Sequence, residues 1–215
     1  MAPTDRIVPR FAAAPPQEPL PYGAWAERLQ AELLSAFARL EQQAADGTAD
    51  PLPEEGLGEP GPLVWFPDRT WGGRTFVPAT AHTSTGVELF GVVSFAPVTA
   101  DGEEPSDFAA TADWTTDTAD ANPDWTIDLC DEVIGGWRGE PGQVAAMTLV
   151  WGNPTGGTSA YTATAELGDL TVDRCNLVEN RFTLLAPDGY QGDTLTIVCW
   201  GADHQEQARE SLYED

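Results

Sequence analysis

The stretch LLAPDGYQGDTLTIVCW, residues 184–200, consists of two apolar runs separated by a turn sequence. Proline presets φ for a turn, and the glycine that follows Pro-Asp accepts backbone conformations that other residues avoid. The second run is rich in Leu, Thr, Ile, Val and Trp, and β-branched and aromatic residues favour strands. The stretch therefore predicts a strand, a tight turn and the closing strand of a β-sandwich.

The same texture extends over residues 63–215, where short apolar runs alternate with clusters of Gly, Pro, Asp and Asn. Several runs alternate with a period of two, which is typical of half-buried strands. One of them places Trp125, Ile127 and Leu129 on one face of a strand. We expect strands near 63–66, 74–82, 87–98, 107–115, 124–131, 143–151, 159–167, 170–174, 181–186 and 194–200. Regular strand spacing without helices predicts a mainly β protein built as an antiparallel β-sandwich.

In this general pattern the region is similar to immunoglobulin-like β-sandwich modules. The Cys…Trp…Cys spacing of a true immunoglobulin domain is absent. The resemblance therefore implies a fold class and no activity.

Three segments precede the predicted sandwich. Residues 1–21 contain six prolines and predict an extended arm. Residues 22–45 predict one amphipathic helix, because apolar side chains recur at steps of three and four. Residues 46–62 are rich in Pro, Gly and Glu and predict a linker. The apolar face of this helix, which we call the helix stripe, must be covered by other apolar side chains. The following domain, a second copy or another protein could supply them.

The arm contains RIVPRF, residues 6–11, which is basic and apolar in an otherwise acidic chain. Such a segment can dock on a partner or pack on its own protein. Together with the helix stripe it defines the residues predicted to bind a protein partner or a second copy: Ile7, Phe11, Trp25, Leu29, Leu33 and Phe37.

The charge of the chain is strongly negative. It has 35 acidic and 10 basic side chains, a net charge of −25, and every basic residue is arginine. Such a surface repels nucleic acid and anionic membranes and favours cationic partners. A saline habitat or a GC-rich genome explains the same composition. The three cysteines form no CxxC pair, and no signal peptide or membrane span is evident. These features predict a soluble, cytoplasmic protein.

Residues 113–132, DWTTDTADANPDWTIDLCDE, contain seven acidic residues and no basic one. Asp117, Asp120 and Asp124 offer oxygen ligands of the kind that Ca²⁺ prefers, although the EF-hand pattern is absent. A β-hairpin explains more, because it would place the two Asp-Trp-Thr repeats on neighbouring strands. A docking surface for a basic partner is the third interpretation.

Eight tryptophans are many for this length, and those in glycine-rich loops are the best candidates for exposure. Trp71, Trp137 and Arg138 are therefore the predicted ligand-binding residues, with a glycan as the ligand. No catalytic residue is predicted, because His82 and His204 have no motif around them. We expect a non-enzymatic interaction or assembly module. A glycan-binding module, with or without Ca²⁺, is the first alternative, and a carboxylate-based enzyme is the second.

Overall fold

The structure is a computed structural model, and it describes residues 25–48, 51–97, 105–138, 144–157, 159–188 and 194–212. The described residues form antiparallel sheets and one helix, so the prediction of a mainly β protein is confirmed. Among them no helix is long and apolar enough to cross a membrane. The chain divides into two compact units at Asp124/Trp125, within the stretch predicted as one domain. We call residues 25–124 the N-terminal unit and residues 125–212 the C-terminal unit.

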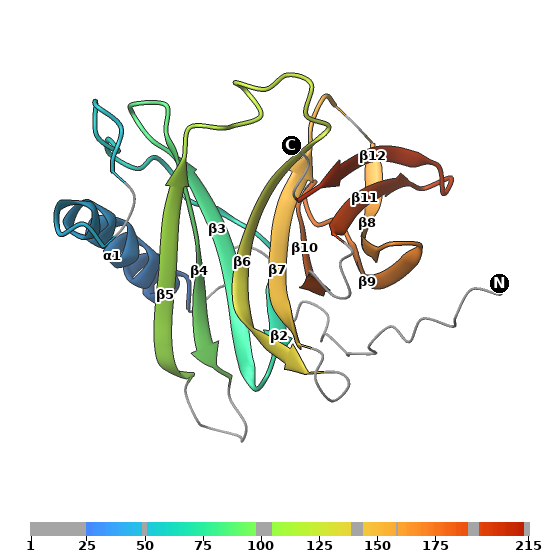
Figure 1. The fold of residues 1–215 in the computed structure, drawn as a ribbon, viewed down its shortest axis with the longest axis horizontal. Coiled ribbons are helices and arrows are strands. Elements are labelled where there is room, and N and C mark those ends of the chain that lie inside the picture. Colours follow the sequence, from blue (N-terminus) through green and yellow to red (C-terminus); the bar gives the residue numbers. More distant parts are fainter. Residues whose placement is uncertain are drawn as a thin grey trace. The chain divides into compact units, whose positions relative to one another are not determined.

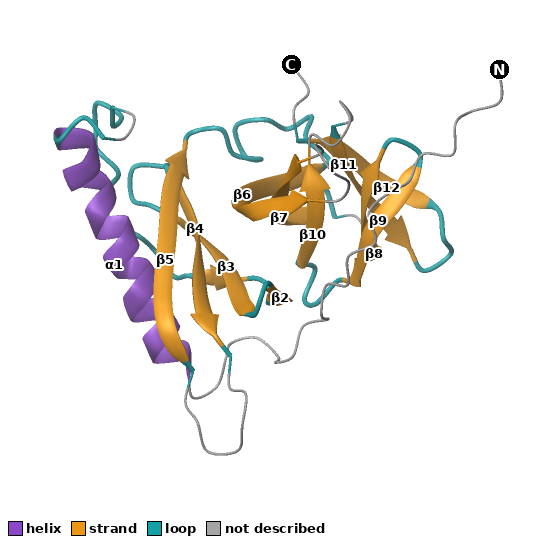
Figure 2. Ribbon diagram, turned by 60° about the horizontal axis from the view of Figure 1, so that its bottom comes forward, coloured by secondary structure: helices purple, strands orange, loops and turns teal. Residues whose placement is uncertain are grey.

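The N-terminal unit is a helix on an antiparallel sheet (Figure 1, Figure 2). Its strands are paired in the order β1-β3-β4-β5, and β2 pairs with β3. The elements are α1 (Ala26–Ala45), β1 (Val64–Trp65), β2 (Arg69–Trp71), β3 (Arg74–His82), β4 (Glu88–Ala96) and β5 (Ser106–Thr115).

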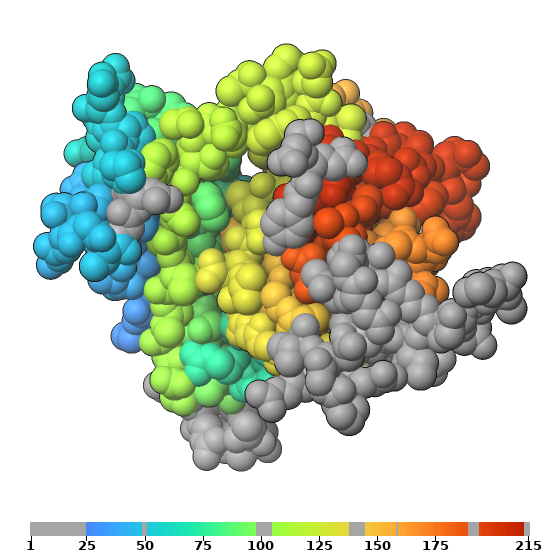
Figure 3. Space-filling model, in the orientation of Figure 1, coloured from blue at the N-terminus to red at the C-terminus, as the bar shows by residue number. Residues whose placement is uncertain are grey.

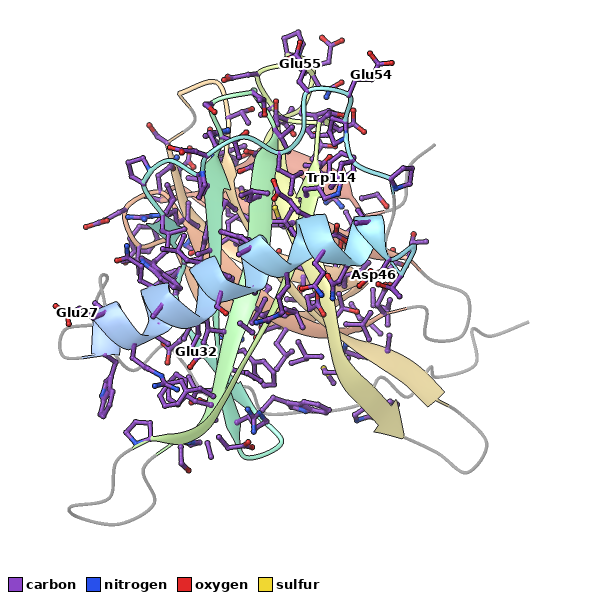
Figure 4. All side chains as sticks on the ribbon, turned by 90° about the vertical axis from the view of Figure 1, so that its left-hand side faces the viewer. Glu27, Glu32, Asp46, Glu54, Glu55 and Trp114 are labelled. Atoms are coloured by element: carbon purple, nitrogen blue, oxygen red, sulfur yellow. The ribbon has the colours of Figure 1, made fainter. Side chains whose placement is uncertain are left out.

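The apolar stripe of α1 packs on this sheet. Leu29, Leu33 and Phe37 are at most 4% exposed and share a core with side chains of β3 and β4. Gly91 of β4 permits the close approach, because a Cβ there would lie 3.1 Å from Leu33 Cδ1 and 2.3 Å from the carbonyl oxygen of Thr111. Figure 4 shows the helix crossing the strands obliquely. Of the three possible covers for the stripe, the structure shows the following domain.

The predicted linker also belongs to the fold of this unit. Leu57 is 3% exposed and lies in the same core. Its carbonyl accepts a hydrogen bond of 2.8 Å from Thr85 Oγ1, and the amide of Gly61 donates to the carbonyl of His82. The segment therefore does not separate the helix from the sheet, as the sequence had suggested, because one apolar residue and these backbone bonds anchor it.

Two arginines of α1 reach the outer strand of the sheet. Arg39 Nη2 donates to the carbonyl of Ala110, 3.2 Å away, and the Arg28 guanidinium lies 5.1 Å from the centre of the Phe108 ring. β5 forms a continuous column beside the helix in Figure 3. Charged side chains along an outer strand oppose the pairing of strands from other molecules.

The C-terminal unit contains two antiparallel sheets. The first has the order β10-β7-β6 and the second the order β12-β11-β8-β9. Their strands are β6 (Ile127–Arg138), β7 (Val144–Pro154), β8 (Ala160–Leu167), β9 (Leu170–Asn176), β10 (Phe182–Asp188), β11 (Leu195–Gly201) and β12 (Glu206–Ser211).

The two sheets share one core. Val150, Phe182 and Leu184 come from the three-stranded sheet, and Ala163 and Ile197 come from the four-stranded sheet. Pro187 and Asp188, which the sequence predicts to begin a turn, belong to β10 and pair with Met147 and Ala146, so this part of the prediction is wrong. The two strands of the stretch belong to different sheets, because β10 pairs with β7 whereas β11 pairs with β8 and β12. That stretch therefore connects two layers of one core.

The predicted acidic hairpin is wrong. Among the described residues, β5 pairs with β4, and β6 pairs with β7. The two Asp-Trp-Thr repeats consequently lie in different units, with Trp114 packed in the core beside α1. Each of the two strands pairs instead with its other neighbour in the sequence.

Candidate functional site

A groove of about 400 Å³ lies within the C-terminal unit, between β6 and β12. Such a volume falls in the range of small-ligand sites. Its lining includes Trp125, Ile127, Leu129, Asp131, Glu210 and Leu212. The alternation predicted for Trp125, Ile127 and Leu129 is confirmed, since all three line this groove. Ile127 is 1% exposed and forms the apolar floor.

One end of the groove is closed by hydrogen bonds around Thr126. Its amide and hydroxyl donate to Glu210 Oε1 at 2.7 and 2.9 Å. The same hydroxyl oxygen accepts from the amide of Arg209 and lies 3.2 Å from the carbonyl oxygen of Arg209. These bonds join the start of β6 to β12 across the two sheets and fix the position of the Glu210 carboxylate.

β12 is held in place from the opposite side as well. Arg209 donates to Glu206 within β12 and to Glu166 Oε2 of β8 at 3.3 Å, so it spans β11. The hydrogen bond with Arg209 lowers the pKa of Glu206, and the same bond raises the pKa of Arg209. One wall of the groove therefore rests on an ion-pair network.

Asp131 lies at the far end of the groove, on the face of β6 that is directed to the core. It is opposite Val150, which is opposite Leu184, and both of these side chains belong to the shared core. Burial raises the pKa of the Asp131 carboxyl, and the nearby Asp188 carboxylate raises it further. Asp131 has no cationic partner in the part of the chain that the structure describes, and a carboxyl on an apolar face without one is an unusual placement.

A further polar atom lies on the same face of the three-stranded sheet. Thr148 is opposite Val133 and Ala186, one step along β7 from the row that contains Asp131. It is 0% exposed, and its Oγ1 has no hydrogen-bond partner among the described residues. Buried hydroxyls are ordinarily paired. Thr148 does not line the groove, so its hydroxyl is a buried polar atom of the core in the row next to Asp131.

A second groove, of about 240 Å³, lies in the N-terminal unit between α1 and the segment around Leu57. Its lining combines apolar side chains, among them Leu34 and Phe37, with the carboxylates of Glu41 and Glu59. Both glutamates are exposed. This groove is smaller and lacks a carboxyl on a core face.

The predicted glycan residues Trp71 and Trp137 belong to different units. Trp71 ends β2 in the N-terminal unit, whereas Trp137 lies near the end of β6 in the C-terminal unit. Trp137 packs beside Ala145 and Leu167. The side chain of Arg138 lies outside the described residues. The half-buried tryptophan at a groove is Trp125, which the sequence analysis had assigned to a hairpin.

The three aspartates predicted for Ca²⁺ are all exposed: Asp117, Asp120 and Asp124. In the parts of the chain that the structure describes, no group of three or more His, Cys, Asp or Glu side chains is arranged to hold a metal ion. The loop is instead ordered by its own turn, in which the carbonyl of Thr118 accepts from the amides of Ala121 and Asn122.

Of the residues predicted to bind a partner, Leu29, Leu33 and Phe37 lie in the core beneath α1, and Trp25 packs at its margin. In the folded unit they cannot also present a docking face. Ile7 and Phe11 lie outside the described residues.

Comparison with models of known protein families, with curated proteins and with solved structures gives no significant match. The function must therefore be argued from the groove.

Proposed function

We propose that this chain is a non-enzymatic, acidic interaction module that binds a short basic and apolar protein segment in the groove between β6 and β12. The observation that carries the proposal is Asp131, a carboxyl that lines the groove on a core face and has no cationic partner among the described residues. A guanidinium or ammonium group bound in the groove would supply that charge.

The arrangement divides the recognition between two kinds of contact. The apolar floor at Ile127 and Leu129, with the Trp125 ring beside it, would bury aliphatic or aromatic side chains. Glu210 and Asp131 at the two ends would pair with cations. The net charge of −25 would attract such a segment over a distance, most strongly at low salt.

The scaffold that we propose for this groove is a β-sandwich. The shared core of the two antiparallel sheets supports it. The general likeness to immunoglobulin-like modules stays a prediction.

The test is a panel of labelled peptides measured by fluorescence anisotropy against the full-length protein. We expect peptides with arginine and aliphatic residues to bind, and acidic or uncharged peptides to bind at least tenfold more weakly. Replacing Asp131→Asn should weaken binding, whereas Asp120→Asn, which removes an exposed charge outside the groove, should not. Equal binding of all peptides, or equal loss in both variants, would refute the proposal.

A glycan is the second candidate ligand, because the half-buried Trp125 and two carboxylates line the same groove, a combination that also suits a sugar. Soluble oligosaccharides that bind the wild type and fail to bind Trp125→Ala, with no peptide binding, would favour it.

A further inference from the structure

We propose that the groove between β6 and β12 receives the chain's own segment Arg6–Phe11, RIVPRF. This inference rests on the proposed function and names its occupant. The segment lies outside the described residues. We therefore compare its sequence with the geometry of the groove.

The charges of the segment and of the groove are complementary. The chain has ten basic side chains, all arginine, and two of them, Arg6 and Arg10, fall within these six residues. The groove has a carboxylate at each end, Glu210 and Asp131. Arginine pairs with carboxylates through two parallel hydrogen bonds, and its guanidinium is less strongly hydrated than an ammonium group.

The separation of the two arginines matches the separation of the two carboxylates. Glu210 is bonded to Thr126, and Asp131 follows five residues later along β6. In an extended strand five residues span about 16 Å. Arg6 and Arg10 are four residues apart, which is about 13 Å in an extended chain. Two flexible arginine side chains readily cover the difference, so both ion pairs can form at once.

Val8 supplies the apolar contact between the two arginines. Pro9 fixes its own φ and disfavours a helical conformation at Val8, so the sequence favours an extended backbone. In such a backbone Arg6, Val8 and Arg10 share one side, whereas Ile7 and Phe11 point to the other. The first side thus presents an apolar group between two basic ones, which is what the floor and the two ends of the groove require.

The experiment uses the full-length chain with Arg6→Gln and Arg10→Gln, so that its own arm lacks the cations. A labelled peptide of residues 3–13 is titrated into it and followed by anisotropy. We expect binding that falls about a hundredfold when Asp131→Asn and Glu210→Gln are added, since each charge-assisted pair accounts for about tenfold. Glu41→Gln with Glu59→Gln, which removes the same charge from the smaller groove, should change binding less than twofold.

A second arm of the experiment leaves the protein unchanged and alters only the peptide. Peptides with both arginines replaced by glutamine, or with Val8→Asp, should lose binding. The inference is overturned if the wild-type peptide does not bind. It is also overturned if that peptide binds equally well to the protein with Asp131→Asn and Glu210→Gln. If other basic and apolar peptides still bind in the groove, only the occupant is wrong. If none of them binds, the proposed function fails with it.

Discussion

The replacement Leu33→Ala tests whether the helix stripe is part of the core of the N-terminal unit. Leu33 is 0% exposed and lies against the backbone of Gly91. Removing three buried carbon atoms costs about 2.4 kcal/mol of transfer free energy at about 0.8 kcal/mol each. The packed sheet cannot collapse fully into the space, so a cavity term brings the expected loss to about 3–4 kcal/mol.

The assay is urea denaturation followed by circular dichroism, together with hydrogen exchange of β3, β4 and β5. Leu34→Ala is the matched control, because the same atoms are removed from a half-buried position on the same helix. We expect it to cost about 1 kcal/mol. A cost below about 0.5 kcal/mol for Leu33→Ala, the size of an ordinary surface change, would refute the packing of the stripe on the sheet.

Three further predictions concern a glycine, a carboxyl and the cysteines. Gly91→Ala should cost at least about 2 kcal/mol in thermal or urea unfolding, because its Cβ would meet a backbone carbonyl of β5 at 2.3 Å, whereas Gly136→Ala has open space and should be tolerated. Asp131→Asn should stabilise the fold above the raised pKa of Asp131, where the wild type keeps a buried charge, and the gain should vanish as the pH falls toward 3.8; a gain independent of pH in paired unfolding curves would contradict this. Burial, with Cys175 nearby, raises the pKa of the Cys199 thiol to about 12, so a thiol reagent at neutral pH should modify the partly exposed Cys130 first and Cys199 only on unfolding; early modification of Cys199, mapped by mass spectrometry, would contradict this.

The local pattern of the sequence predicts most elements well. The expected helix at 22–45 corresponds to α1, and the expected strand at 74–82 coincides with β3. Such segments have one buried face, so the period of their apolar residues reports their conformation. β12 is not among the expected strands, because Ala208 is its one buried side chain and so leaves no apolar period to detect.

The pairing of β5 and β6 and the existence of the groove could not be predicted from the sequence. The assumption that neighbouring strands pair produced the wrong hairpin at 107–131. The groove joins β6 to residues about 80 positions later, and its closing bonds run from Thr126 to Glu210. One signal was present: the alternation through Ile127 and Leu129 continues to Asp131, which places an acid on an apolar face.

The strands, the amphipathic helix, the acidity and the isolated basic segment in the arm can all be recognised in the sequence, because each depends on residues close together in the chain or on composition. The tertiary structure alone decided that the helix stripe has its cover within the N-terminal unit, and that Asp131 and Glu210 stand at two ends of one groove. These outcomes depend on which distant apolar faces pack together, and apolar burial is not directional. The local sequence therefore predicts that a face is buried, and only the folded chain shows which segment packs against that face.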